Sequence, residues 1–111
     1  MAHLAPEEMA RRIGAGLLSF PVTHFGNDHA FQADPYREHC AWMASHDVAG
    51  LFAAGGTGEF FSLTPDEVEQ VVTAAAAEVG GKVPLLSGCG YGTAIAVDLA
   101  QRAERAGAQG L

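Results

Sequence analysis

Residues 48–67, VAGLFAAGGTGEFFSLTPDE, contain a strand, a glycine-rich loop and a helix start in that order. The apolar run at 48–54 is short and ends at a glycine, which is typical of a buried strand in a parallel sheet. Thr64 can cap the helix that follows, and Glu67 stands three residues later, where it completes a capping box. The loop at 55–63 therefore joins the carboxyl end of a strand to a helix, where backbone N–H groups can bind an anion.

Strand and helix alternate through the rest of the chain. Short connections between them favour βα units and a mostly parallel sheet, either doubly wound or part of an eight-fold barrel. A complete barrel needs about 250 residues, so this chain would supply about three and a half of its eight units. Strands are predicted at 16–20, 48–54, 83–87 and, as the start of a fourth, 109–111; helices are predicted at 5–13, from Asp34, at 65–79 and at 93–106.

The composition favours a small-molecule partner. A chain of 111 residues with 49% hydrophobic content is one globular domain or part of one. Its net charge of −7 disfavours nucleic acid and membrane surfaces as partners, and no apolar stretch approaches the ~20 residues of a membrane span. Cys40 and Cys89 lack any CxxC spacing, so we expect reduced thiols in a cytoplasmic protein. Arg11 and Arg12 precede a run that glycines interrupt, which disfavours a twin-arginine export signal.

Several other residues are candidates for chemistry. The turn GCGYGT at 88–93 comes near a dinucleotide-binding fingerprint, although its third glycine is misplaced by one, and a nucleotide site stays open as an alternative. Five histidines, of which His39 and His46 could share a helix face, show no metal-binding spacing, so we expect neither a metal nor a cofactor. Lys82, the only lysine, precedes a strand and would lie at the edge opposite to the loops.

The glycine-rich loop itself offers two polar side chains beside its backbone. Thr57 is the side chain in the turn that can hydrogen-bond a ligand oxygen, and Glu59 is expected to hydrogen-bond the backbone and hold the loop. The alternative interpretation is a tight βα turn whose glycines serve backbone geometry alone.

Three stretches together resemble a known family: GLLSFPVTHF at 16–25, DVAGLFAAGGTGEFFSLTPDE at 47–67 and VPLLSGCGYGT at 83–93. They are similar to the amino-terminal part of the dihydrodipicolinate synthase and N-acetylneuraminate lyase superfamily. The resemblance implies a (β/α)8 TIM barrel whose lysine forms a Schiff base with a 2-keto acid. Residues 1–111 would then be a partial barrel domain that stops at the start of the fourth strand.

The family's usual loop is GTTGE, whereas this chain has GGTGE, with Gly56 in place of the first threonine. That variant resembles the members that dehydrate and decarboxylate the sugar acid 5-dehydro-4-deoxy-D-glucarate to 2,5-dioxopentanoate. The resemblance implies that Gly56, Thr57 and Gly58 bind the substrate carboxylate next to the keto group. A class I aldolase or synthase of the same family is the alternative, and a non-catalytic module that binds an anion or nucleotide is another.

The same resemblance places the Schiff-base lysine and the catalytic tyrosine beyond Leu111. We therefore expect no catalytic residue in this chain, no activity from the chain alone, and a homo-oligomer for the full-length enzyme. Apolar strand surfaces would lie at an open edge, so we also expect the isolated chain to associate or aggregate.

Overall fold

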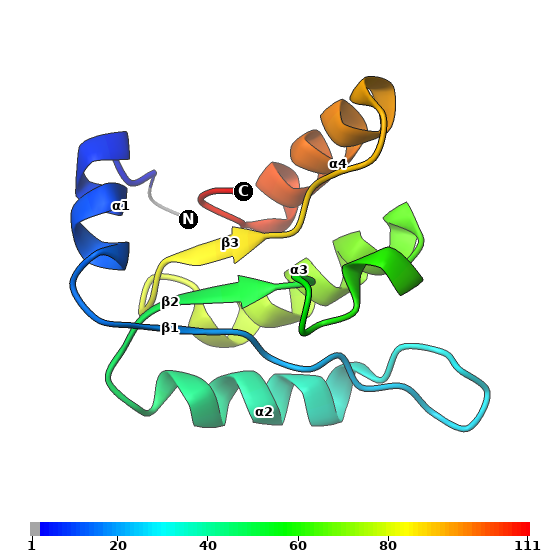
Figure 1. Ribbon diagram of the computed structural model, residues 1–111. Coiled ribbons are helices and arrows are strands. Elements are labelled where there is room, and N and C mark those ends of the chain that lie inside the picture. Colours follow the sequence, from blue (N-terminus) through cyan, green and yellow to red (C-terminus); the bar gives the residue numbers. More distant parts are fainter. Residues whose placement is uncertain (1–2) are drawn as a thin grey trace.

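The computed structural model describes residues 3–111 as a three-stranded parallel sheet with helices packed against it (Figure 1). The expected domain span of 1–111 includes Met1 and Ala2, which lie outside the described residues. The elements follow in the predicted order, and one short 3-10 helix, η1, was not predicted. They are α1 (Pro6–Ile13), β1 (Leu17–Ser19), α2 (Ala33–Ala44), β2 (Val48–Ala53), η1 (Phe60–Ser62), α3 (Pro65–Val79), β3 (Leu85–Ser87) and α4 (Thr93–Ala106).

The strand order distinguishes between the two predicted architectures. The strands lie side by side in the order β1-β2-β3, and Gly110 forms a parallel bridge with Leu86, so the chain turns into a fourth strand position beside β3. Helices α2, α3 and α4 pack next to one another along the sheet (Figure 1). A doubly wound sheet would reverse its strand order and place crossover helices on both faces. The sequential order is that of a barrel, which confirms that prediction.

The helix-facing side of the sheet forms the core. Leu51 and Leu85 are fully buried there against the apolar face of α3. The predicted capping box begins α3: the Glu67 N–H donates to Thr64 Oγ1 at 3.2 Å, and the Thr64 N–H donates to Glu67 Oε1 at 2.9 Å. Their helical spacing predicts one apolar face for five residues of this helix, and all five are buried, namely Val68, Val71, Val72, Ala75 and Val79.

The residue spacing predicts Trp42 on the column beside the apolar face of α2, and either Ile95 or Ala96 on the inner face of α4; Trp42 and Ile95 are exposed, and Ala96 is half-buried. Trp42 of α2 is 61% exposed, whereas Tyr36 and Cys40 on the same helix are buried. Ile95 of α4 is 47% exposed, and the inward positions of that helix are Leu99 and Ala103. Spacing alone does not tell which of two adjacent columns of a helix faces the core.

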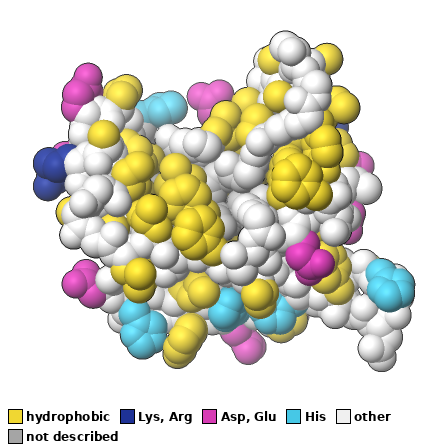
Figure 2. Space-filling view, in the orientation of Figure 1, with side chains coloured by type: hydrophobic (Ala, Val, Ile, Leu, Met, Phe, Trp, Pro, Cys, Tyr) yellow, Lys and Arg dark blue, Asp and Glu magenta, His cyan; other side chains and the backbone are white. Residues whose placement is uncertain are grey.

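The opposite face of the sheet is only partly covered. Ile13 of α1 contacts it at Gly50, near the amino ends of the strands. Further along, Phe20 and Phe52 stack with ring centroids 4.8 Å apart, and Phe20 is 41% exposed. Figure 2 shows apolar side chains gathered over this face of the sheet and, separately, near η1 and the start of α4. A half-covered apolar face is what the inner wall of a barrel presents.

Candidate functional site

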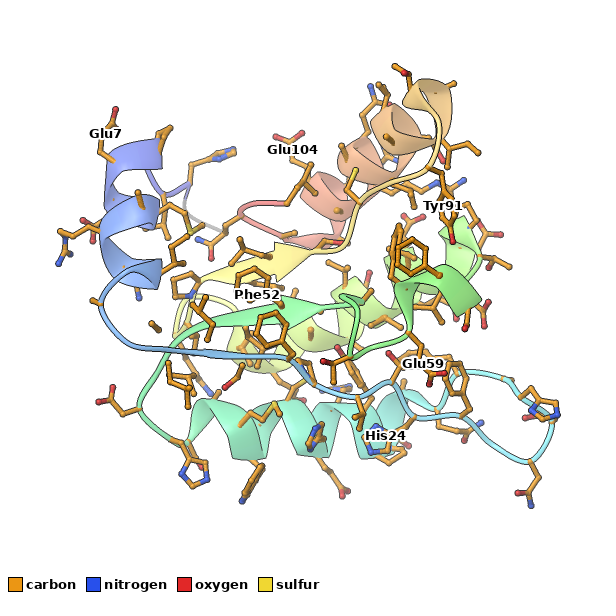
Figure 3. The ribbon with its side chains drawn as sticks, viewed as in Figure 1. Glu7, His24, Phe52, Glu59, Tyr91 and Glu104 are labelled. Carbon is orange, nitrogen blue, oxygen red and sulfur yellow. The ribbon has the colours of Figure 1, made fainter. Side chains whose placement is uncertain are left out.

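Three connections meet at the carboxyl edge of the sheet, where Figure 3 shows Glu59 and Tyr91. They are residues 20–32 after β1, 54–64 after β2 and 88–92 after β3. None of these segments contains a lysine or arginine. An anion bound at this edge by the chain must therefore be held by N–H and hydroxyl donors.

Hydrogen bonds within its own backbone hold the first part of the glycine-rich loop. The Glu59 N–H donates to the Gly56 carbonyl at 3.1 Å, and the Phe60 N–H donates to the Gly55 carbonyl at 3.0 Å. Ala54 and Glu59 adopt left-handed φ angles of 51° and 63°, which non-glycine residues rarely take. Strained residues of this kind persist only where surrounding contacts determine them, and they cluster at functional sites.

Three backbone donors and one hydroxyl lie together in this loop. The N–H groups of Gly56, Thr57 and Gly58 donate to no other residue in the described part of the chain, and the exposed Thr57 hydroxyl has no partner there either. The structure thus places the three predicted binding residues on consecutive positions with donors available to a ligand. A cluster of unused N–H groups is a suitable cradle for a carboxylate.

The two glycines of the cradle differ in their surroundings. A Cβ at Gly56 would meet nothing within 4 Å, so the position opens onto free space. A Cβ at Gly58 would lie 3.1 Å from Thr23 Oγ1 and 3.2 Å from the Pro21 carbonyl oxygen. Gly58 is therefore needed for close packing, whereas Gly56 leaves room beside the cradle.

The predicted role of the Glu59 side chain is not what the structure shows. That carboxylate is exposed and makes no hydrogen bond to residues 3–111, because the left-handed backbone leaves the side chain at the surface (Figure 3). Support for the loop comes instead from the Glu59 backbone and from Thr23. Thr23 is 6% exposed, and its hydroxyl donates to the Gly58 carbonyl at 2.6 Å. In the sequence, Thr23 is marked only by its position shortly after a predicted strand, and that position alone does not predict a role in the site.

The second glycine-rich turn packs on the first. A Cβ at Gly88 would lie 2.0 Å from the Ala54 carbonyl oxygen, and one at Gly90 would lie 3.2 Å from the Phe60 ring. Tyr91, at a φ of 70°, stacks on Phe60 with ring centroids 5.3 Å apart. Close packing alone therefore explains Gly88 and Gly90. This favours a structural role for the turn at 88–93 over binding of a nucleotide.

The histidines form a contact that the sequence did not predict. His46 lies beyond the end of α2, so it does not share a helix with His39 as expected. His39 instead meets His24 edge to face, with ring centroids 5.4 Å apart. His24 Nδ1 and His39 Nε2 are buried without a hydrogen-bond partner among the described residues. Burial, and then the proximity of His24, lowers the pKa of His39 below its usual range.

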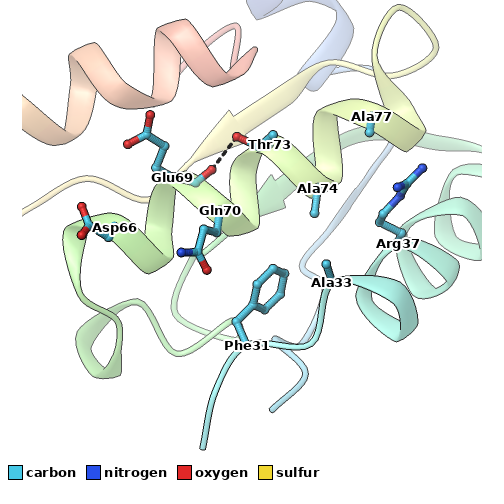
Figure 4. Close-up of a pocket in the computed structure, with 9 residues that line it drawn as sticks. All are labelled: Phe31, Ala33, Arg37, Asp66, Glu69, Gln70, Thr73, Ala74 and Ala77. Carbon is cyan, nitrogen blue, oxygen red and sulfur yellow. Dashed lines mark hydrogen bonds between the residues drawn. The ribbon is translucent and has the colours of Figure 1, made fainter. Parts of the chain in front are cut away.

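A groove of about 600 Å³ lies elsewhere, between α2 and α3 (Figure 4). Its charged groups are already engaged: Arg37 pairs with Glu78, and Asp66 and Glu69 both pair with Arg102. With no unpartnered buried donor directed into it, this groove has no feature of a binding site. The candidate site therefore remains at the carboxyl edge of the sheet, and the exposed Lys82 lies at the opposite edge, before β3.

Comparison with known proteins agrees with this fold. The profile of the Dihydrodipicolinate synthetase family matches residues 14–111. The chain belongs to this family. Among solved members, dihydrodipicolinate synthase from Bacillus clausii superposes with a TM-score of 0.86 at 25% identity, over 92% of this chain and 34% of that one. The synthase from Agrobacterium tumefaciens superposes with a TM-score of 0.83 at 33% identity, over 90% of this chain and 34% of that one.

Curated relatives in the family have higher identity. This chain is 60% identical over all 111 residues to a probable 5-dehydro-4-deoxyglucarate dehydratase of Bradyrhizobium diazoefficiens, and 57% identical to one of Ralstonia nicotianae. It covers 35% and 36% of their lengths, so it spans about a third of the curated relatives it matches. Its three strands and helices are consecutive βα units of the family's TIM barrel. Within residues 3–111, no helix has the length and apolar character needed to cross a membrane.

Proposed function

We propose that this chain supplies the carboxylate cradle of a lyase that acts on 5-dehydro-4-deoxy-D-glucarate. In that reaction the six-carbon substrate loses one water and one carbon dioxide and gives 2,5-dioxopentanoate. The carboxylate next to the keto group is retained in the product, so it is the group that needs fixed donors throughout. Gly56, Thr57 and Gly58 provide them, and a lysine outside this chain forms the Schiff base.

The observation that carries the proposal is the free donor set of the loop together with the open space at Gly56. Within the family the identity to relatives named as dehydratases, 60%, is about twice the 25–33% to the synthases above. A threonine at position 56 would fill part of the space beside the cradle, whereas Gly56 leaves that space free for a six-carbon sugar acid. We further propose that the full-length enzyme works in the cytoplasm as a homo-oligomer; the two free thiols, Cys40 and Cys89, support the reducing compartment.

A grafted enzyme tests the proposal. Residues 1–111 replace the matching segment of the Bradyrhizobium diazoefficiens relative, which is feasible because the two are 60% identical over the whole chain. We expect the grafted enzyme to release carbon dioxide and 2,5-dioxopentanoate from 5-dehydro-4-deoxy-D-glucarate, and to be inactive with pyruvate and an aldehyde. Turnover of pyruvate with the aldehyde would identify an aldolase or synthase instead. Binding of the sugar acid without turnover would favour a non-catalytic module.

A further inference from the structure

We propose that Thr23 is the positioning residue of the carboxylate cradle, holding the glycine-rich loop in its receptive shape from the connection after β1. This inference rests on the function proposed above, since it assigns to Thr23 the placement of the donors at Gly56, Thr57 and Gly58.

Thr23 contacts the loop at Gly58, the buried glycine of the cradle. Its hydroxyl donates to the Gly58 carbonyl at 2.6 Å, and both residues are buried. The next N–H, that of Glu59, donates back to the Gly56 carbonyl at 3.1 Å. The segment from Gly56 to Glu59 is thus held at both ends, and the N–H groups between them are left for a ligand.

The strained backbone of the loop calls for contacts from outside it in addition to its own hydrogen bonds. Ala54 and Glu59, on either side of the cradle, both have left-handed φ angles, so the loop relaxes unless other contacts oppose it. The Glu59 side chain makes no hydrogen bond in the described chain. Among side chains, Thr23 makes the hydrogen bond that joins the loop to a neighbouring strand's connection, across 35 residues of sequence.

Close packing makes the hydroxyl hard to replace. The Cβ position of Gly58 lies 3.1 Å from Thr23 Oγ1 and 3.2 Å from the Pro21 carbonyl oxygen. A methyl group in place of the hydroxyl would press on the Gly58 carbonyl and leave it without a donor. A buried carbonyl that loses its partner is costly, so the loop would move to find another.

Three substitutions separate the hydroxyl from the volume of the side chain. Thr23→Ala removes the donor without a clash, Thr23→Val removes it and keeps the shape, and Thr23→Ser keeps the donor. In the grafted enzyme we expect Thr23→Ala and Thr23→Val to raise KM for 5-dehydro-4-deoxy-D-glucarate about tenfold. The kcat of both variants should stay within about threefold of the parent, because a displaced cradle weakens binding in the ground state and the transition state alike. Thr23→Ser should restore KM.

Amide hydrogen exchange provides a readout that does not depend on turnover. Followed by mass spectrometry in the 111-residue chain and in the grafted enzyme, the peptide covering 54–62 should exchange faster in Thr23→Ala and Thr23→Val, and at the parent rate in Thr23→Ser. Equal KM and equal exchange in all three variants of an active graft would overturn the role of Thr23 alone. An unsubstituted graft that neither binds nor converts the sugar acid would contradict the proposed function, while the exchange data would still decide whether Thr23 holds the loop.

Discussion

At the residue scale, glycine serves three purposes at the carboxyl edge. Gly88 allows two backbones to approach, since a Cβ there would meet the Ala54 carbonyl oxygen at 2.0 Å. Gly58 allows the loop to pack on Thr23 and Pro21, and Gly56 has nothing within 4 Å of its Cβ position. The same residue type is therefore a packing requirement at two positions and an opening at the third.

Alanine substitutions should separate these purposes. Gly88→Ala should destabilise the grafted enzyme by about 3 kcal/mol, because the backbone atom it meets cannot move aside without disturbing β2. Gly56→Ala, the matched control, should change the free energy of unfolding by less than about 0.5 kcal/mol. Urea unfolding followed by circular dichroism measures both. Equal stability of the two variants would contradict the packing described for Gly88.

The two cysteines should differ in reactivity. Cys40 is fully buried, and burial raises the pKa of its thiol to about 11; Cys89 is exposed. Iodoacetamide at neutral pH should therefore alkylate Cys89 in the folded chain and reach Cys40 only after unfolding, since the thiolate is the nucleophile. Mass spectrometry of the 111-residue chain, with and without urea, counts the labels. Two labels without urea would mean that the core around α2 is open.

At the element scale, local signals explain what could be predicted from the sequence. The capping box of Thr64 and Glu67 and the valine spacing of α3 lie within one helix, so they identify it without tertiary information. The Thr23 hydrogen bond, the His24–His39 contact and η1 depend on packing between segments distant in sequence, and the sequence carries no pattern for them. The sequence could mark the loop as a candidate anion site, but it could not show the open space at Gly56 or the hydrogen bond from Thr23.

The His39 environment predicts a pH dependence of stability. Its pKa is lowered in the fold by burial and by His24, so the unfolded chain binds a proton more readily than the folded one. The stabilising effect of neutral His39 is present above about pH 6.5 and is lost as the pH falls from there to the lowered pKa. His39→Phe should flatten this part of the stability curve between pH 7.5 and 5, as measured by urea unfolding at each pH. An unchanged slope in His39→Phe would contradict this assignment.

At the scale of the whole molecule, the proposed cradle and the one lysine of the chain lie at opposite edges of the sheet. The cradle lies at the carboxyl edge, while Lys82, the only lysine, is exposed at the amino edge. Phe20 on the inner face is 41% exposed and Leu17 of β1 is 66% exposed, as expected for one part of a barrel wall. These side chains support the prediction that the isolated chain self-associates.

The isolated chain should form no covalent adduct with a 2-keto acid. Pyruvate and borohydride applied to the 111-residue chain should leave its mass unchanged, because Lys82, the only lysine, lies at the opposite edge of the sheet from the cradle. The grafted enzyme, treated in the same way with its own substrate, should gain the mass of one reduced adduct. A stoichiometric adduct on Lys82 of the isolated chain would refute this separation.

The central claim, that the loop binds the carboxylate beside the keto group, is tested most directly by the hydroxyl of Thr57 in the grafted enzyme. Thr57 is exposed and lacks a partner among residues 3–111, so replacing it should not disturb the fold. Steady-state kinetics with 5-dehydro-4-deoxy-D-glucarate should show kcat/KM about 10- to 100-fold lower in Thr57→Val, the value of one hydrogen bond to a charged group, and near the parent value in Thr57→Ser. A Thr57→Val enzyme with the parent kcat/KM would contradict the claim.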